Sequence, residues 1–166
     1  MPESDEFFFN WSDEYSVGIP TIDKQHQELV NMLNRLFIAA SGREDARTAG
    51  GILNALMDYT RTHFSLEERL LLAAKYPDFE RHKLEHQKMI AKLDQLTRRF
   101  RLEEEQVYLE LLGFLRSWLK EHILDSDMRY SETLRQAGFS TKAWEQDAKT
   151  EFDSMVERTG RWYRIW

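Results

Sequence analysis

The segment His82-Lys83-Leu84-Glu85-His86 places two histidines four residues apart. On an α-helix, residues at this spacing lie about 40° apart around the axis, so both imidazoles point from one face. The segment His63-Phe64-Ser65-Leu66-Glu67 repeats the spacing with a histidine and a carboxylate. Imidazole and carboxylate groups are both common metal ligands. The two segments therefore predict a metal site between helices.

All five histidines of the chain belong to this pattern. His26 stands alone, and His122 is followed five residues later by Asp127. On a regular α-helix that separation is about 140°, so we expect Asp127 to reach the site from the side. Five imidazoles and two carboxylates exceed what a single ion holds, and they predict a binuclear metal site. Its candidate ligands are His26, His63, Glu67, His82, His86, His122 and Asp127.

Length and composition narrow the class of protein. A chain of 166 residues is one ordinary domain, and the absence of cysteine excludes disulfides and thiolate metal sites. A net charge of −6 argues against nucleic-acid binding. The longest apolar run is too short to span a membrane, and the first residues lack the pattern of a secretory signal. We therefore expect a cytoplasmic location.

Apolar residues recur every three or four positions in four stretches, at about 22–40, 44–74, 78–100 and from 104 into the 130s. This period is typical of helices with one buried face. Ser41-Gly42 and Tyr76-Pro77 mark breaks, and short connections make consecutive helices antiparallel. The sequence predicts an all-α protein: an up-down-up-down four-helix bundle with an additional C-terminal helix.

This topology predicts that the candidate ligands meet at one end of the bundle interior. They lie near the starts of the first and third helices and near the ends of the second and fourth. A buried, ionised Glu67 or Asp127 without a partner would cost several kcal/mol, and a bound cation removes that cost. The alternative, ordinary core histidines with surface acids, requires all seven residues to share this placement by coincidence.

Residues 139–166 form an amphipathic extension beyond the candidate domain of residues 1–138. Ser140 can cap a fifth helix with one apolar stripe, formed by Trp144, Ala148, Phe152, Met155 and Val156. One interpretation is a helix that folds back on its own bundle. The other is a docking surface for a protein partner or a second copy. Arg158 to Trp166 favours docking, because arginine, tryptophan and tyrosine are enriched in interface hot spots.

Four segments resemble the hemerythrin family, and its single-domain bacterial form in particular. The resemblance runs from about Phe9 to about Gly138. Ferritin-like bundles need Glu-x-x-His pairs, which this chain lacks. The matching segments are Trp11 to His26, His63 to Glu68, Tyr76 to His86 and Trp118 to Asp127.

The resemblance implies a non-heme centre of two iron ions (Fe2+/Fe3+) with a bridging oxo or hydroxo group. His82, His86 and His122 would bind one iron, His26 and His63 the other, and Glu67 and Asp127 would bridge both. Counting donors for two octahedral ions leaves one open position, on the iron with two histidines.

The function implied is reversible dioxygen binding for storage, delivery or sensing. Dioxygen would bind end-on as hydroperoxide at the open position, taking two electrons from the irons and the proton of the bridge, so the buried charge stays unchanged. Reversibility requires a dry pocket. Leu29, Phe64, Phe114 and Trp118 are placed to line it, although simple core packing also explains them.

Two other classes of function remain open. A di-iron site of this kind can be an enzyme, acting as a peroxidase or oxidase or on nitric oxide. An enzyme would need acid or base groups beside the open position. The motifs contain no unassigned histidine and no spare buried acid, so we assign no catalytic residue. The third class, an interaction module, is suggested only by the extension.

Overall fold

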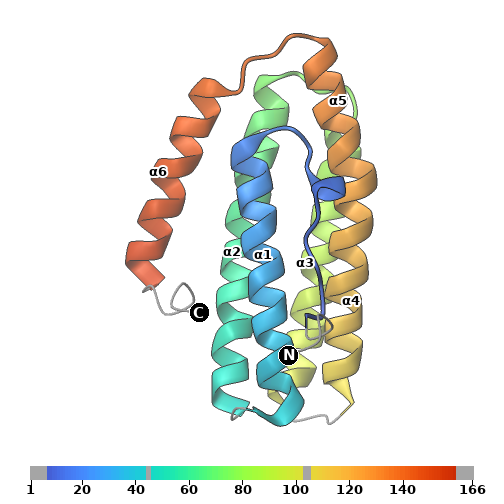
Figure 1. Cartoon of the computed structure of the whole chain (residues 1–166), viewed down its shortest axis with the longest axis vertical. Coiled ribbons are helices and arrows are strands. Elements are labelled where there is room, and N and C mark those ends of the chain that lie inside the picture. The colour runs from blue at the N-terminus through green and yellow to red at the C-terminus, as the bar shows by residue number, and fades with distance from the viewer. Residues whose placement is uncertain (1–6, 44–45, 103–105, 160–166) are drawn as a thin grey trace, which may run out of the picture.

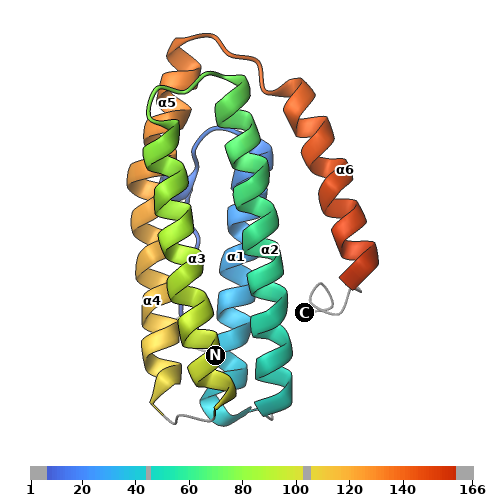
Figure 2. The same ribbon diagram turned by 180° about the vertical axis from the view of Figure 1, so that it is seen from behind.

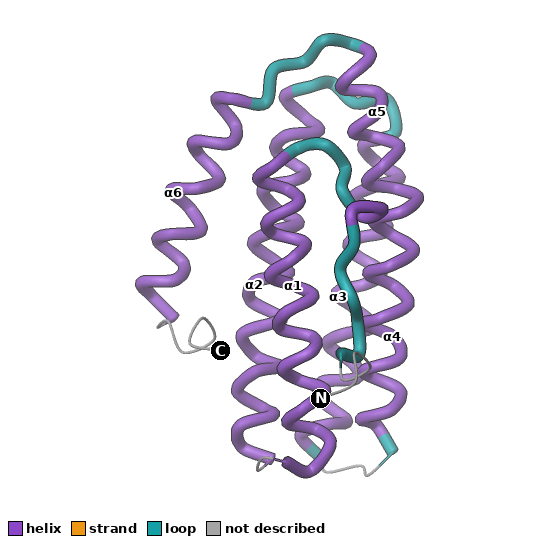
Figure 3. The backbone as a smooth tube through the Cα atoms, viewed as in Figure 1, coloured by secondary structure: helices purple, strands orange, loops and turns teal. Residues whose placement is uncertain are grey.

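The structure, a computed structural model, describes residues 7–43, 46–102 and 106–159. Four long helices, α1 (Pro20–Ile38), α2 (Ala46–Ala73), α3 (Phe79–Arg101) and α4 (Val107–His122), alternate in direction and enclose one core (Figures 1 and 2). Within the described ranges there is no strand (Figure 3). The predicted all-α, up-down-up-down bundle is confirmed. None of the helices in those ranges combines the length and apolar character needed to cross a bilayer.

Local signals in the sequence set the helix ends. Pro20 begins α1 at its first helical position, where a missing N–H costs no hydrogen bond. Lys75 ends α2 in the left-handed conformation (φ 54°), and the N–H of Tyr76 returns to the carbonyl of Leu71 at 2.9 Å. This is a Schellman-type cap, and Pro77 prevents the helix from continuing. The tight turn makes α3 antiparallel to α2.

The predicted fourth helix consists of three consecutive pieces. α4 continues through a π-helical turn, η3 (Ile123–Asp127), into α5 (Met128–Gln136). The bonding pattern i→i+5 of a π-turn accommodates one residue more per turn than an α-helix. This extra residue corrects the predicted angle between His122 and Asp127: five residues now make roughly one turn, so both side chains lie on the same face.

An N-terminal arm runs along the bundle before α1 begins (Figure 3). The backbone of Phe9 exchanges two hydrogen bonds with the side chain of Asn34 on α1, at 2.8 and 2.9 Å. A short 3-10 turn, η1 (Asp13–Tyr15), follows in the arm. Asp23 then accepts hydrogen bonds from Ser16 and Val17, which tie the end of the arm to the first turn of α1.

The C-terminal helix α6 (Lys142–Thr159) folds back along α1 and α2 (Figures 1 and 2). A cap at Ser140 predicts a helix that begins at Thr141, and the observed helix begins one residue later, at Lys142. The carbonyl of Thr141 accepts a hydrogen bond from the N–H of Glu145 at 2.9 Å. The predicted apolar stripe is buried at Trp144, Ala148, Phe152 and Met155. The side chain of Val156 and residues 160–166 lie outside the described part. The stripe therefore packs on the chain's own bundle.

Candidate metal centre

The first two candidate ligands project from α2 into the bundle. His63 and Glu67 lie one helical turn apart, with Nε2 of His63 3.5 Å from Oε2 of Glu67. Glu67 is fully buried. A carboxylate without water around it needs positive charge or several donors nearby. The surrounding side chains supply them.

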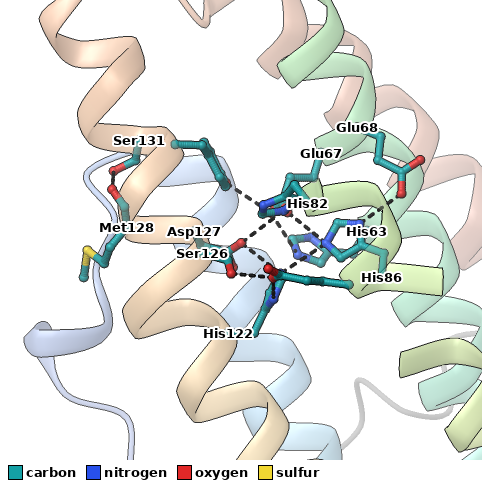
Figure 4. A network of polar contacts seen from close by, with 12 residues as sticks. His63, Glu67, Glu68, His82, His86, His122, Ser126, Asp127, Met128 and Ser131 are labelled. Atoms are coloured by element: carbon teal, nitrogen blue, oxygen red, sulfur yellow. Dashed lines mark hydrogen bonds and ion pairs between the residues drawn. The ribbon is translucent and has the colours of Figure 1, made fainter. Parts of the chain in front are cut away.

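The facing helix α3 contributes two imidazoles to the other oxygen of Glu67. Nε2 of His82 lies 2.6 Å and Nε2 of His86 lies 3.2 Å from Oε1 (Figure 4). Nε2 of His122, from the end of α4, approaches Nε2 of His86 to 3.2 Å. The spacing of four residues in α3 thus has the predicted effect, with both rings directed at one point.

Asp127 joins the cluster through the π-turn. Its Oδ1 lies 3.1 Å from Nε2 of His122 and 3.4 Å from Nε2 of His82. Its Oδ2 lies 3.1 Å from Nε2 of His26, which enters from α1. The structure therefore brings all seven predicted ligands together at one level of the bundle.

The donor atoms fall into two sets that the two carboxylates connect. Glu67 groups with His82, His86 and His122, and also with His26 and His63, with the atoms of each group within 4.8 Å of one another. Asp127 repeats this division, because one of its oxygens faces the three-histidine set and the other faces His26. Two adjacent cation positions bridged by both carboxylates fit this arrangement.

Unpaired polar atoms at the centre support the same conclusion. His26 and Asp127 are each 1% exposed, yet among the described residues neither nitrogen of His26 and neither oxygen of Asp127 has a hydrogen bond of acceptable geometry. Buried polar groups in proteins are almost always hydrogen-bonded, and exceptions need an explanation. Donor atoms that converge on one space are suited to a cation. Nitrogen and oxygen donors are compatible with iron, manganese and zinc.

A second layer of side chains orients the imidazoles. Oε1 of Gln25 lies 2.6 Å from Nδ1 of His63, and Oε1 of Glu68 lies 3.0 Å from Nδ1 of His86. An oxygen that accepts a hydrogen bond from the Nδ1–H group leaves the lone pair of Nε2 free for a metal.

Two more residues extend this layer. Oε2 of Glu85 lies 3.2 Å from Nδ1 of His122 and also accepts a hydrogen bond from Ser126. The hydroxyl of Tyr130, fully buried on α5, donates to Oε2 of Glu67 at 3.1 Å. We had not predicted a role for Gln25, Glu68, Glu85 or Tyr130. The sequence offers one indication for the first three, because each stands directly next to a candidate ligand. It offers no such indication for Tyr130, which follows Asp127 by three residues.

The electrostatics of the centre differ between its two sides. Burial lowers the pKa of His63 to about 3, so this ring is neutral at pH 7. Burial also disfavours charge on His122, but Asp127 and Glu85 together raise its pKa to about 10. The hydrogen bond with His122 in turn lowers the pKa of Glu85 to about 2. A cation held by Nε2 of His122 would occupy the position of that proton, so metal and proton compete there.

Comparisons with known proteins agree with the geometry. The family model described as the hemerythrin HHE cation binding domain matches residues 17–134. This chain belongs to the hemerythrin family. A bacteriohemerythrin of Pseudomonas aeruginosa is 37% identical over 127 residues, or 76% of this chain and 82% of that protein. One of Stenotrophomonas maltophilia is 34% identical over 125 residues, or 75% and 80%.

A crystal structure of wild-type hemerythrin has a TM-score of 0.70 and 31% identity, and the match covers 75% of this chain and 96% of that one. The hemerythrin model ends at residue 134, before the turn that leads into α6. The seven candidate ligands all lie inside the matched range. The candidate centre therefore lies within the part of the chain that matches the family, and α6 lies beyond the matched range.

An apolar cavity of about 20 Å³ lies next to the candidate metal centre. That is room for about one water-sized molecule. Three of the four predicted pocket residues, Leu29, Phe64 and Trp118, line it. Phe114 does not, and its neighbour Leu115 lines it instead. The reason is the position of each residue around the helix axis. Leu115, seven residues before His122, lies about 20° from the direction of His122, whereas Phe114, eight residues before it, lies about 80° away.

The cavity wall also contacts the ligand rings. Phe64 stacks on His86 with ring centroids 3.7 Å apart, and Trp118 stacks on His122 at 4.2 Å. The only polar lining residue, Thr60, donates its hydroxyl to the carbonyl of Leu56 at 2.7 Å. The cavity thus offers a small, apolar space beside the centre.

Proposed function

We propose that this protein binds dioxygen reversibly at a non-heme di-iron centre. In this proposal His82, His86 and His122 hold one iron, and His26 and His63 hold the other. Glu67 and Asp127 bridge both ions together with an oxo or hydroxo group from solvent. The observation that supports this most is that each carboxylate directs one oxygen at each histidine set.

The two sets differ by one imidazole, which leaves an open position on the iron held by His26 and His63. When bound, the iron pair would supply two electrons and the hydroxo bridge one proton to dioxygen, which would be held end-on there as hydroperoxide. The remaining requirements fall on the protein: it must hold the ligands rigidly, keep water out and supply no stray proton.

The surrounding residues meet these requirements. Three of the imidazoles donate a hydrogen bond from Nδ1 to a side-chain oxygen, so these rings cannot turn freely. The oxygens belong to Gln25, Glu68 and Glu85. The apolar cavity admits a molecule about the size of dioxygen but offers it no free hydrogen-bond donor. Water inside such a space would lose its own hydrogen bonds, which disfavours its entry.

A di-iron enzyme is the alternative. A peroxidase, an oxidase or an enzyme acting on nitric oxide would need an acid or base directed at the open position. Among the described residues, the only fully buried acids are Glu67 and Asp127, which the centre itself uses. This favours binding over catalysis, in storage, delivery or sensing of oxygen.

Optical spectroscopy on the iron-loaded protein tests the proposal. Reduced protein exposed to air should develop charge-transfer absorption that disappears under vacuum and returns with air over several cycles. Asp127→Ala should not show the cycle, because one bridge is missing. A spectrum that forms once and decays within a turnover, with consumption of oxygen, would support the enzyme instead.

A further inference from the structure

A cleft of about 730 Å³, which we call the α1–α6 cleft, lies between the C-terminal helix and the bundle. Its size is within the range of pockets that bind small organic molecules. Residues of α1, α2 and α6 line it, among them Thr21, Lys24, Gln25, Tyr59, Ala143 and Phe152. The α6 side of this cleft lies beyond residues 17–134, which the hemerythrin model matches.

Gln25, one of the residues that line the cleft, carries a buried donor without a partner among the described residues. Its side chain is 3% exposed, and its Oε1 accepts from Nδ1 of His63. This orientation leaves the amide nitrogen Nε2 buried without a hydrogen-bond partner among the described residues. Such a group usually has an acceptor that the chain itself does not provide. The cleft is where that acceptor can be placed.

The deeper wall of the cleft is aromatic. The rings of Tyr59 and Phe152 lie 4.9 Å apart and are both buried. Ala143 leaves space on the α6 side. A ligand that uses this wall therefore carries an apolar body as well as a hydrogen-bond acceptor.

Both signs of charge line the cleft, with the basic residues Lys24, Lys142 and Lys149 and the acidic residues Glu28, Glu145 and Asp153. Lys24 and Lys142 lie near the starts of α1 and α6. A hydrogen bond from Thr21 to Glu145 at 3.1 Å joins these two helix starts. Glu28 and Asp153 lie further along the two helices. Neither Lys24 nor Lys142 forms an ion pair with a described residue. Both helix starts also direct N–H groups to this end, which favours a negative charge.

We propose that the α1–α6 cleft binds a small organic carboxylate with an apolar body. The carboxylate accepts the hydrogen bond from Nε2 of Gln25 and pairs with the ammonium group of Lys24. The apolar body lies against Tyr59 and Phe152. The site requires only that α6 is packed as described, and it does not depend on what the iron centre binds.

Calorimetric titration of the iron-loaded full chain with 4-phenylbutyrate tests the site. The same titration with 4-phenyl-1-butanol tests the carboxylate, because the alcohol has the same body without the charge. We expect saturable binding of one phenylbutyrate with a Kd below about 1 mM, and binding of the alcohol weaker by about ten-fold or more.

Two variants and a control locate the binding. Lys24→Gln should weaken phenylbutyrate about ten-fold by removing its ion pair, and Ala143→Phe should abolish binding by filling the cleft. Lys120→Gln, at an exposed lysine on α4, should change nothing. Absence of saturation, equal affinity for acid and alcohol, or unchanged binding to Lys24→Gln would overturn the proposal. So would a crystal soaked with phenylbutyrate in which only water contacts Gln25.

Gln25 also connects the cleft to His63, and only this last test rests on the proposed iron function. Saturating phenylbutyrate should shift the absorption spectrum of the di-iron protein, and it should leave the spectrum of Ala143→Phe unchanged. Calorimetric binding without a spectral shift would contradict the connection to His63. A chain that binds phenylbutyrate but no oxygen would instead contradict the proposed function and leave the cleft standing.

Discussion

At the scale of single residues, Glu67 has the most connections in the centre. Its two oxygens face both histidine sets, and Tyr130 donates to one of them. His86, by comparison, belongs to one set only and is held in place by Glu68. A bridging carboxylate contributes both a donor atom to each ion and a compensating charge. Loss of a single imidazole removes one neutral donor from one ion.

We therefore expect Glu67→Ala to lower the iron content from two ions per chain to below one. His86→Ala should retain more iron, because the bridges and the second set stay complete. Asp58→Ala is the control, since it removes an exposed carboxylate of α2 outside the centre and should keep close to two irons. Elemental analysis of each purified protein measures this. Equal losses in Glu67→Ala and His86→Ala would contradict a bridging role.

Neighbouring positions on α4 allow a sharp test of the cavity. Leu115 lines it and Phe114 does not. Leu115→Asn should bring a polar group and water next to the centre and increase the rate of autoxidation several-fold with iron content unchanged. Phe114→Asn should have a smaller effect. The decay of the oxygenated spectrum gives both rates, and a larger effect at Phe114 would place the oxygen pocket elsewhere.

At the scale of secondary structure, η3 contributes most to the geometry of the centre. In a continuous α-helix, Asp127 would lie about 140° from His122. The π-turn brings the two onto one face, so that Asp127 reaches both His122 and His26. π-turns inside α-helices often mark functional sites, and this one determines where Asp127 lies.

A deletion and an insertion in η3 should lower the iron content per chain to different extents. Deletion of Leu124 converts the π-turn into an α-turn with His122 and Asp127 four residues apart, the spacing that already serves His63 and Glu67. Insertion of an alanine after Leu124 rotates Asp127 and Tyr130 by about 100° away from the centre. We expect the deletion to keep more iron than the insertion, as measured by iron per chain. The reverse order would show that the π-turn does not position Asp127.

The contrast between α3 and η3 explains how far the sequence can predict this centre. His82 and His86 could be assigned to one face because their spacing has a fixed meaning on a regular helix. No residue in Ile123–Asp127 indicates a π-turn, since the tertiary contacts of this segment, such as those of Ser126 with Glu85 and of Asp127 with His26, join residues far apart in the sequence. Gln25 and Glu85 are polar types common on surfaces, so their contacts with ligand imidazoles appear only once the helices are packed.

At the scale of the whole molecule, α6 adds a fifth helix to a family bundle. Its amphipathic stripe predicted a buried face but not the surface that buries it. The structure packs the stripe on α1 and α2, where Nε1 of Trp144 donates to the carbonyl of Leu66 at 2.6 Å. An exposed ion pair between Arg69 and Glu151 adds to this contact. A role of the extension in partner binding or self-association stays a prediction.

A chain that ends after Gly138 should retain two irons, because all seven candidate ligands precede α6. Its melting temperature should fall by about 10 °C, since three large apolar side chains, Trp144, Phe152 and Met155, lose their burial. The surface of α1 and α2 exposed in this way should also favour self-association. Calorimetry, size-exclusion chromatography and iron analysis measure the three effects. Loss of iron would show that α6 is required to complete the centre.

Anomalous diffraction from crystals of the iron-loaded protein tests the central claim most directly. Data on both sides of the iron absorption edge should show two peaks about 3.5 Å apart inside the bundle. Glu67 and Asp127 should each contact both peaks. Three histidines should contact one peak, and His26 and His63 the other. A single peak would contradict the account. Two peaks whose anomalous signal changes across the zinc edge instead of the iron edge would contradict it as well.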